Sequence, residues 1–270
     1  MIDYLVVGHV THDITPNGLV AGGTVTYSSR VAQALGCRTA VVTSAARDLD
    51  LDQIFPGMEV IRVPAAKTTT FENVYDNRGR KQFIHSVAEK ITVAHIPEDW
   101  RRAKIVHLGP ISNELDPDLV SIFSNSLVGI TPQGWYRRWK DDGQVYIDDW
   151  PEAEEVLKLA GAVIVSPEDL PSTKTIKHIR KWCQLVVLTL QSSGSRVYFR
   201  NESRPIAAPD ANEVNPTGAG DIFTTAFLIR LYQTRGNPWE AAEFANRIAA
   251  ISVSHQGLVE KIKAIKKNIS

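Results

Sequence analysis

The chain has 270 residues, and its 30 basic and 30 acidic side chains leave no formal net charge at neutral pH. That balance provides no global basic field for nucleic acid, and no apolar run approaches the ~20 residues that cross a bilayer. Two isolated cysteines, Cys37 and Cys183, supply neither a disulfide framework nor zinc-ligand spacing. An acid at Asp3 and the lack of a basic first segment argue against a signal peptide, so we expect a soluble, cytoplasmic protein.

Short apolar runs alternate with amphipathic stretches, which is the pattern of a mostly parallel α/β sheet with helices on both faces. This length allows one large domain or two smaller ones; without repeats or a linker, we expect a single domain over 1–270. Strands are predicted at Tyr4–Val7, Thr39–Thr43, Ile105–Leu108, Leu127–Ile130, Ala162–Val165 and Leu185–Leu190. Helices are predicted at Val25–Leu35, Asp118–Asn125, Glu152–Leu159 and Thr173–Cys183, with two more, Ala219–Tyr232 and Pro238–Ser254, closing the chain.

Two segments, about 9–21 and 67–88, do not fit this alternation. The first is polar and carries Pro16 and Gly18 directly after the first strand. The second alternates polar and apolar residues around an expected turn at Asn77–Gly79, which predicts an exposed hairpin. Together they predict a small β lid over the carboxyl ends of the main sheet, where open α/β sheets bind ligands.

The most informative motif is Asn215–Phe223, with the sequence NPTGAGDIF, which stands where a long helix begins. Glycine lets an anion approach the backbone N–H groups, and those groups carry partial positive charge at a helix start. A phosphate suits such a place. Asp221 would repel that phosphate unless it had a task, and removing a proton from an attacking hydroxyl is the obvious one. The alternative is structural, with Thr217 capping the helix and Asp221 favoured only by the helix dipole.

The rest of the chain resembles the PfkB (ribokinase-like) family of carbohydrate and nucleoside kinases. The signature is NPTGAGDIFTTAFLIRL at 215–231, and the similarity continues in VVGHVTHD at 6–13, AGGTVTYSSRVAQALG at 21–36 and TTTFENVYDNRGR at 68–80. It ends with VVLTLQSSGSRVYF at 186–199 and AAEFANRIAAISVSHQG at 241–257. The resemblance implies a ribokinase-like fold and phosphoryl transfer to a hydroxyl. A P-loop kinase is excluded, because the sequence has no G-x-x-x-x-G-K-[ST].

The resemblance also implies roles for individual residues. Asp221 would be the catalytic base, and Gly218, Ala219 and Gly220 would form the anion hole. Asp13, His12, Gly22 and Gly23 would bind the acceptor. The nucleotide would be bound by Thr189, Gln191, Ser193, Gly194, Thr217, Asn246 and Ser252. Where many relatives keep an asparagine after the glycine pair, this chain has Tyr27, Ser28 and Ser29, which leaves the acceptor open.

VSPEDL at 165–170 occupies the place of the family's Asn-x-x-Glu metal motif. Glu168 and Asp169 are the candidate Mg²⁺ residues, since this ion is often held through water by one or two carboxylates. The structural alternative is a helix start, with Ser166 as the cap and Pro167 at the first helical position. Both interpretations can hold together.

TPQGWYRRW at 131–139 resembles the Gln-x-x-x-Arg block of inositol kinase-like members of the family, as do His12–Asp13 and Ser166–Asp169. Gln133 and Arg137 are therefore candidate acceptor-site residues, and Arg137 suits a phosphate. The alternative is a solvated basic face of Arg137, Arg138 and Lys140, with Trp135 and Trp139 as packing anchors.

We therefore expect an ATP-dependent, Mg²⁺-requiring kinase for a small sugar or cyclic polyol, with inositol as the first candidate. The sequence leaves open whether a monovalent cation such as K⁺ is a further cofactor. A nucleoside kinase is the alternative within the family, because Phe71, Tyr75 and Phe83 offer aromatic surface on the lid. A sugar- or nucleotide-binding regulatory protein without turnover is the alternative outside it. No nucleic acid or membrane partner is expected, and an unpaired lid edge makes a homodimer possible.

Overall fold

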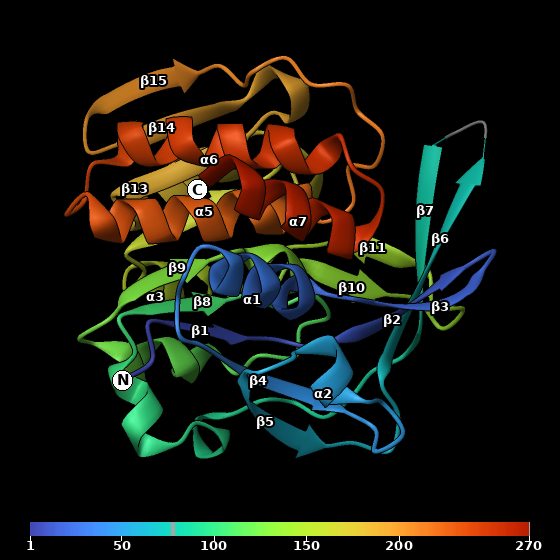
Figure 1. The fold of residues 1–270 in the computed structure, drawn as a ribbon. Helices are drawn as coiled ribbons and strands as arrows, with labels where there is room; N and C mark the ends of the chain where they lie inside the picture. Colours follow the sequence, from blue (N-terminus) through green and yellow to red (C-terminus); the bar gives the residue numbers. More distant parts are fainter. Residues whose placement is uncertain (77–78, 270) are drawn as a thin grey trace.

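The computed structural model describes residues 1–76 and 79–269, and its centre is a nine-stranded sheet (Figure 1). The strand order is β15-β14-β13-β12-β9-β8-β1-β4-β5. Every pairing from β13 to β5 is parallel, whereas β14 and β15 join antiparallel at one edge. The strands are β1 (Tyr4–Val7), β4 (Thr39–Ala45), β5 (Glu59–Pro64), β8 (Ile105–Leu108), β9 (Leu127–Ile130), β12 (Ala162–Val165), β13 (Leu185–Thr189), β14 (Ser195–Phe199) and β15 (Glu202–Ile206).

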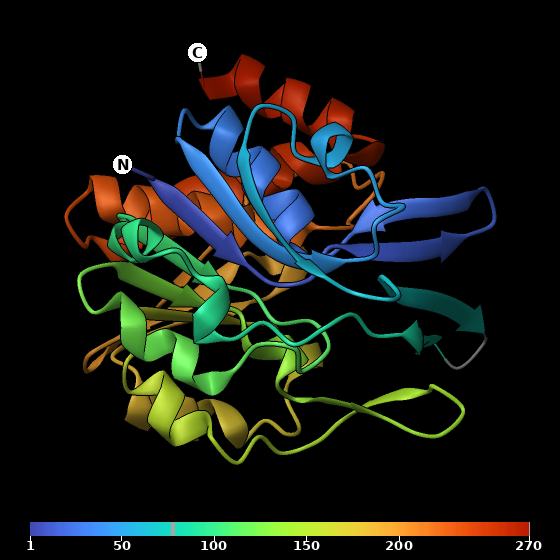
Figure 2. The ribbon, with the colours of Figure 1, turned by 90° about the horizontal axis from the view of Figure 1, so that it is seen from below.

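Helices cover both faces of this sheet, as the view from below shows (Figure 2). One face carries α1 (Thr24–Ala34), α5 (Ala219–Gln233), α6 (Pro238–Val253) and α7 (Gly257–Ile269), and the other carries α3 (Ala153–Leu157) and α4 (Thr175–Trp182). The short helix α2 spans Leu51–Ile54. The 3₁₀ turns are η1 (Val93–His95), η2 (Glu98–Arg102), η3 (Pro117–Phe123), η4 (Pro132–Gly134), η5 (Pro167–Asp169) and η6 (Gln191–Ser193). Central strands such as β1 and β8 are buried throughout, as expected for a parallel sheet covered on both faces.

These elements confirm the predicted α/β class, and the predicted strands lie within a residue or two of the observed ones. Two expectations were wrong. The segment predicted as a helix at Asp118–Asn125 is the 3₁₀ turn η3, which begins at Pro117 after the capping side chain of Asp116. The chain closes with three helices, because α7 follows α6 after a turn at 254–256 and begins at Gly257, whose φ of 71° suits glycine.

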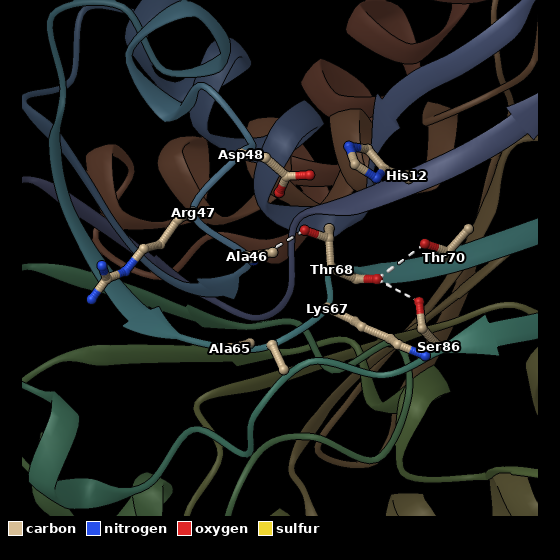
Figure 3. Close-up of a pocket in the computed structure, with 10 residues that line it drawn as sticks. His12, Ala46, Arg47, Asp48, Ala65, Lys67, Thr68, Thr70 and Ser86 are labelled. Carbon is tan, nitrogen blue, oxygen red and sulfur yellow. Dashed lines mark hydrogen bonds between the residues drawn. The ribbon is translucent and has the colours of Figure 1, made fainter.

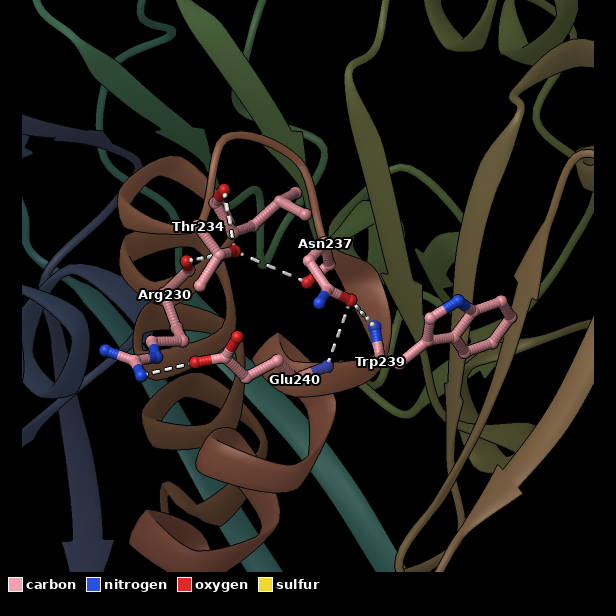
Figure 4. A network of polar contacts seen from close by, with 6 residues as sticks. Arg230, Thr234, Asn237, Trp239 and Glu240 are labelled. Atoms are coloured by element: carbon pink, nitrogen blue, oxygen red, sulfur yellow. Dashed lines mark hydrogen bonds and ion pairs between the residues drawn. The ribbon is translucent and has the colours of Figure 1, made fainter.

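A polar network joins α5 to α6 at the turn between them (Figure 4). Oδ1 of Asn237 accepts from the backbone N–H of Trp239 at 3.2 Å and of Glu240 at 3.4 Å, which caps α6. Arg230 of α5 pairs with the carboxylate of Glu240. The hydroxyl of Thr234 donates to the Arg230 carbonyl at 2.8 Å and ends α5. This turn holds the C-terminal end of α5 against the start of α6.

The two segments that departed from the alternation form a second sheet with the order β3-β2-β6-β7. Its strands are β2 (Thr11–Thr15), β3 (Gly18–Gly22), β6 (Thr69–Asp76) and β7 (Gly79–Ser86). A two-stranded ribbon, β10 (Arg137–Trp139) with β11 (Val145–Ile147), lies beside it through the bridge from Phe83 to Gln144. Figure 1 shows this sheet projecting from one side of the main body. The expected turn at Asn77–Gly79 includes residues 77 and 78, which lie outside the described residues.

Candidate active site

The first turn of α5 is shaped by Gly218, which caps the helix in the left-handed conformation with φ 77°. A Cβ atom there would lie 2.2 Å from the Tyr27 ring. The position therefore requires glycine for two reasons, the positive φ and the lack of room for a side chain. Gly220 is different, since a Cβ atom at that position would meet nothing within 4 Å. The first turn therefore has open space beside Gly220 and a tightly packed glycine before it.

The backbone amides of this turn divide into engaged and available groups. The N–H of Ala219 donates to the Pro216 carbonyl at 3.0 Å, so one of the three predicted anion-hole amides is engaged within the turn. The first α-helical bond runs from Ile222 N–H to the Gly218 carbonyl at 2.9 Å. Within the described chain, no carbonyl accepts from the N–H of Gly220 or Asp221, as expected for a first helical turn. Those two amides are the best-placed anion donors, and Asp221 was expected only as a base.

The Asp221 carboxyl group has a pKa raised from its ordinary value to about 6. Burial is the main cause, and the negative charges of Asp169 and Asp13 add to it. A hydrogen bond from Thr24 and the positive charge of Arg137 act in the opposite direction. The carboxyl groups of Asp13, Asp169 and Asp221, which come from three separate segments, therefore lie close enough for their charges to interact. The resulting pKa suits a group that must accept a proton near neutral pH.

Gln133 and Arg137 reach this carboxyl group through Thr24. Arg137 Nη2 donates to Gln133 Oε1 at 2.9 Å, and Gln133 Nε2 donates to Thr24 Oγ1 at 3.4 Å. Arg137 is 8% exposed, lies 3.9 Å from Asp169 Oδ1 and donates to the Ile111 carbonyl at 3.0 Å. A buried guanidinium with these contacts does not fit the alternative of a solvated basic face for this residue. Trp135 is buried and stacks on Trp150, in agreement with its role as a packing anchor.

Asp13 belongs to the second sheet and is held in place by its neighbours. Thr11 Oγ1 donates to Asp13 Oδ1 at 2.9 Å on the same face of β2. A Cβ atom at Gly22 would lie 2.2 Å from Asp13 Oδ2, so glycine at 22 makes room for this carboxylate. Gly23 has φ 85°, and a Cβ there would lie 2.4 Å from the His9 carbonyl. The glycine pair therefore lets the backbone pass close to the acid and to the start of α1.

His12 does not share a face with Asp13, because side chains alternate along a strand. It lines a separate pocket of about 580 Å³ with Arg47, Asp48 and Lys67 (Figure 3). The Thr68 carbonyl in this pocket accepts from Ser86 Oγ at 2.6 Å and from Thr70 Oγ1 at 3.0 Å. The family resemblance implied that His12 and Asp13 would both bind the acceptor, whereas the strand geometry directs their side chains to opposite faces.

Glu168 and Asp169 point to different neighbours after β12. Glu168 Oε1 accepts from Gln191 Nε2 at 2.6 Å, whereas Asp169 faces Arg137. Ser166 also caps η5, with its hydroxyl accepting from the Glu168 N–H at 3.4 Å. Among the described residues, no group of three or more His, Cys, Asp or Glu side chains could hold a metal ion. These two acids alone would not enclose a Mg²⁺ ion. They would suit one whose other ligands are donor phosphates and water, as in kinase sites.

Six of the seven residues predicted to bind nucleotide divide into two groups, and the seventh, Thr217, lies in the loop before α5. Thr189, Gln191, Ser193 and Gly194 lie at the end of β13 and in η6, at the same sheet edge as Asp169. Asn246 and Ser252 are buried at 3% and 0% exposure. Asn246 Nδ2 donates to the Ile206 carbonyl at 3.0 Å and to Ser195 Oγ at 3.2 Å, and Ser252 Oγ donates to the Ala249 carbonyl at 2.7 Å. Asn246 thereby joins α6 to the β14–β15 edge, whereas Ser252 bonds within α6 itself. Both side chains are buried and engaged, and their role as nucleotide contacts stays a prediction.

Sequence reasoning missed Thr24, Thr11 and the backbone amide of Asp221. Thr24 stands directly after the glycine pair, and nothing in its sequence neighbourhood indicates a partner 197 positions away. Thr11 had a signal, since it lies two residues before Asp13 and alternation places such residues on one face. The Asp221 amide had a signal as well, because the first four N–H groups of any helix are unpaired.

Comparison with known proteins agrees with this geometry. The sequence model described as "pfkB family carbohydrate kinase" matches residues 150–265, which contain Asp169, the β13 end and the first turn of α5. The predicted family resemblance is confirmed. In the part of the chain that is described, no helix has the length and apolar character needed to span a bilayer.

Two curated relatives align over most of the chain. A cytidine kinase of Thermococcus kodakarensis is 27% identical over 263 residues, which covers 89% of this chain and 91% of the relative. An inositol 3-kinase of Arabidopsis thaliana is 26% identical over 273 residues, which covers 94% and 74%. Among solved structures, a pyrophosphate-dependent kinase in the ribokinase family, complexed with a pyrophosphate analog and myo-inositol, has a TM-score of 0.81. It is 23% identical and covers 97% of this chain and 99% of its own, so it confirms the ribokinase-like fold.

Proposed function

We propose that this chain, whose residues 150–265 match the pfkB family of carbohydrate kinases, is a phosphotransferase that acts on a hydroxyl group of a small sugar or cyclic polyol. ATP is the proposed donor and myo-inositol the first acceptor to test. The observation that carries the proposal is the Asp221 carboxyl group, which has a pKa of about 6 and lies beside unpaired amides in the first turn of α5. A base and an anion-binding site are thereby adjacent on one helical turn.

The reaction follows from these positions. The acceptor hydroxyl gives its proton to Asp221 while its oxygen forms a bond to the terminal phosphorus of the donor. The bond from that phosphorus to the donor's bridging oxygen breaks, and the donor leaves as ADP. The amides of Gly220 and Asp221 stabilise the charge on the transferring group, because donors fixed in advance need no rearrangement during the reaction. Arg137, buried beside Asp169, supplies a fixed positive charge to the same region.

Mg²⁺ would be held by Asp169 and Glu168 through water together with the donor phosphates, and it would neutralise phosphate charge when bound. Asp13 would bind acceptor hydroxyls, since a carboxylate accepts two such bonds. We further propose that residues 1–270 form one domain and that the β3-β2-β6-β7 sheet closes over the acceptor to exclude water. The exposed Leu19 and Val20 lie on its edge strand β3, which is where a second copy would pair.

A nucleoside acceptor is the second candidate, because the cytidine kinase aligns over most of this chain. The buried ring of Phe71 in the second sheet argues for a polyol. Phe71 is 4% exposed and packs with Ile84 and Ile111 below the Arg137 guanidinium, so its ring offers no open face to a base. Phe83 is partly exposed, and the Tyr75 side chain lies outside the described residues.

The test is turnover with a panel of acceptors and two donors. Myo-inositol, ribose, fructose and cytidine should each be assayed with ATP and with pyrophosphate, following the release of ADP or of phosphate and the phosphorylated product. The highest kcat/KM for myo-inositol with ATP supports the proposal. The highest value for cytidine would replace the acceptor, and turnover with pyrophosphate alone would replace the donor.

Asp221→Asn separates the mechanism from the substrate. It should lower kcat roughly 10²–10⁴-fold if Asp221 is the base, with the melting temperature preserved. Asp52→Asn is the matched control, because Asp52 is also an acid in a first helical turn, in α2. An Asp221→Asn protein with unchanged kcat would overturn the assignment of the base.

A further inference from the structure

The signature loop before α5 is held by a buried cation. Lys261 of α7 is 1% exposed, and its Nζ donates to the carbonyl oxygens of Asn215 and Thr217, each at 2.7 Å. Within the described residues no carboxylate forms an ion pair with this lysine, so its polar partners are these backbone oxygens. Burial lowers its pKa to about 8. The ammonium thus lies in a carbonyl-lined position that interior packing alone does not explain.

Burying an ammonium without a counter-ion is unfavourable, and lysine is almost never fully buried unless it is paired. Helix α7 has apolar neighbours on the same face, Ile262 and Ile265, which pack into the core without any such cost. An aliphatic residue at 261 would satisfy that packing equally well. The presence of a buried ammonium group at 261 is therefore explained by its hydrogen bonds to the two loop carbonyl groups.

The bound loop is built to turn its carbonyl groups toward Lys261. The N–H groups of Val214 and Asn215 both donate to the Val253 carbonyl at the end of α6, at 2.8 and 2.9 Å. The N–H of Thr217 donates to Asn215 Oδ1 at 2.8 Å. With its N–H groups engaged in these bonds, the loop presents the Asn215 and Thr217 carbonyl oxygens to one ammonium.

The Thr217 carbonyl has a second relationship, to Asp221. It stands four residues before Asp221, which is the place of the acceptor for the Asp221 N–H if α5 began one residue earlier. Lys261 takes this oxygen, and the Asp221 amide has no carbonyl partner within the described chain. Lys261 therefore both holds the loop and keeps that amide available to an anion.

We propose that Lys261 is a built-in monovalent cation of the phosphoryl-transfer site. Its ammonium occupies the carbonyl position that a free cation such as K⁺ would need, orders the 215–217 loop and sets the amides of Gly220 and Asp221. This inference rests on the proposed function for its effect on turnover. It makes Lys261 a positioning residue, and it predicts that the enzyme needs no added K⁺ or Na⁺.

The first experiment uses the wild-type protein. Turnover is measured at constant ionic strength in choline chloride, NaCl, KCl and NH₄Cl, with Mg²⁺ present throughout. The expected kcat in choline chloride lies within about twofold of that in KCl. Activation by K⁺ of tenfold or more in the wild-type protein would overturn the proposal, and this arm carries no risk of misfolding.

The second experiment removes the ammonium in two ways. Lys261→Met fills the position with an uncharged chain, and Lys261→Ala leaves the carbonyl oxygens open. In choline chloride both variants should lose at least tenfold in kcat, with the acceptor KM changed by less than threefold. K⁺ or NH₄⁺ should restore at least a third of the lost rate in Lys261→Ala and much less in Lys261→Met. Lys263→Met is the control, since Lys263 lies on the same helix, is exposed and bonds Glu260.

Melting temperature gives a readout independent of turnover. KCl in place of choline chloride should raise the melting temperature of Lys261→Ala by several degrees, with no such difference in the wild type or Lys263→Met. Wild-type kcat in Lys261→Ala in choline chloride, or loss of activity that no cation restores, overturns the proposal. If the wild type phosphorylates none of the acceptors, the proposed function fails, and the cation-specific melting of Lys261→Ala still decides the cation site.

Discussion

The Nη2 group of Arg137 donates a hydrogen bond of 2.9 Å to Oε1 of Gln133, and this contact sets the direction of the contacts beyond it. Because Oε1 is the acceptor, the amide nitrogen of Gln133 faces Thr24 Oγ1, 3.4 Å away, and can only donate to it. The Thr24 hydroxyl proton is thereby directed to Asp221, whose pKa it lowers. A buried charge at Arg137 thus influences the candidate base through two uncharged side chains.

The pH dependence of turnover follows from this network. Asp221 acts as a base only when deprotonated, so log kcat/KM should fall by one unit per pH unit below about 6, the pKa of its carboxyl group. Thr24→Val removes a hydrogen bond that stabilises the charged form, so the acidic limb should move to higher pH. Thr39→Val, at a buried threonine whose hydroxyl donates to the Cys37 carbonyl, is the control. A pH–rate profile of Thr24→Val that superimposes on the wild-type profile would show that this bond does not tune the base.

Gly220→Ala should separate activity from stability. The new methyl group meets nothing within 4 Å, and Gly220 has ordinary helical φ, so helix propensity should raise stability by up to ~1 kcal/mol. The same methyl group would stand in the space where an anion approaches the amides, so kcat should fall by ~10²-fold or more, as for loss of an oxyanion donor. Urea unfolding and steady-state kinetics measure the two effects. Gly36→Ala, outside the site, is the comparison for a glycine change with open space but positive φ.

Gly22→Ala tests the acceptor site. Its methyl group would lie 2.2 Å from Asp13 Oδ2 and 2.7 Å from Thr11 Oγ1, so the carboxylate must move. We expect the acceptor KM to rise at least tenfold and the donor KM to stay within about twofold. Gly18→Ala lies on the same strand with nothing within 4 Å, and although its φ of 107° strains an alanine and should lower stability, it should leave the acceptor KM unchanged. A rise in donor KM alone would place Asp13 with the donor.

Acid stability should depend on His107, which lies fully buried in β8. Its Nδ1 lies 2.9 Å from Tyr4 Oη and its Nε2 lies 3.0 Å from Thr131 Oγ1, and burial lowers its pKa to about 3. Between about pH 6.5 and 3 the unfolded chain binds a proton at this residue that the folded chain does not bind. Its contribution to stability is therefore lost as pH falls through that range, with a slope of up to ~1.4 kcal/mol per pH unit.

The difference between wild type and His107→Gln isolates this effect from other groups. Asp221 acts in the opposite direction, because its raised pKa makes the folded state bind the extra proton. The free energy of unfolding of wild type should therefore fall more steeply than that of His107→Gln between pH 6.5 and 5. His178→Gln, at an exposed histidine, should follow the wild-type slope. Parallel curves for wild type and His107→Gln would contradict the lowered pKa.

The sequence by itself determined the local structure and the chemistry of one turn. Buried four-residue strands such as Tyr4–Val7 and Ile105–Leu108 are readable because apolar runs between glycines and polar residues have few other conformations. The start of α5 at Ala219 can also be predicted from local sequence. Gly218 can adopt the left-handed backbone conformation that precedes the helix, and a long apolar stretch follows it. From that turn alone we could predict backbone amides suited to a phosphate and, beside them, the Asp221 carboxylate as a candidate base.

Only the tertiary structure decided which distant groups act on that turn. His12 and Asp13 are adjacent in sequence, yet strand alternation places them on opposite faces. Thr24, Gln133 and Arg137 meet Asp221 because parallel strands bring their carboxyl ends to one edge of the sheet. Lys261 lies on a helix that the sequence pattern did not predict, and its role depends on two carbonyl groups more than forty residues away. Such contacts arise from packing between elements, and local sequence patterns do not encode them.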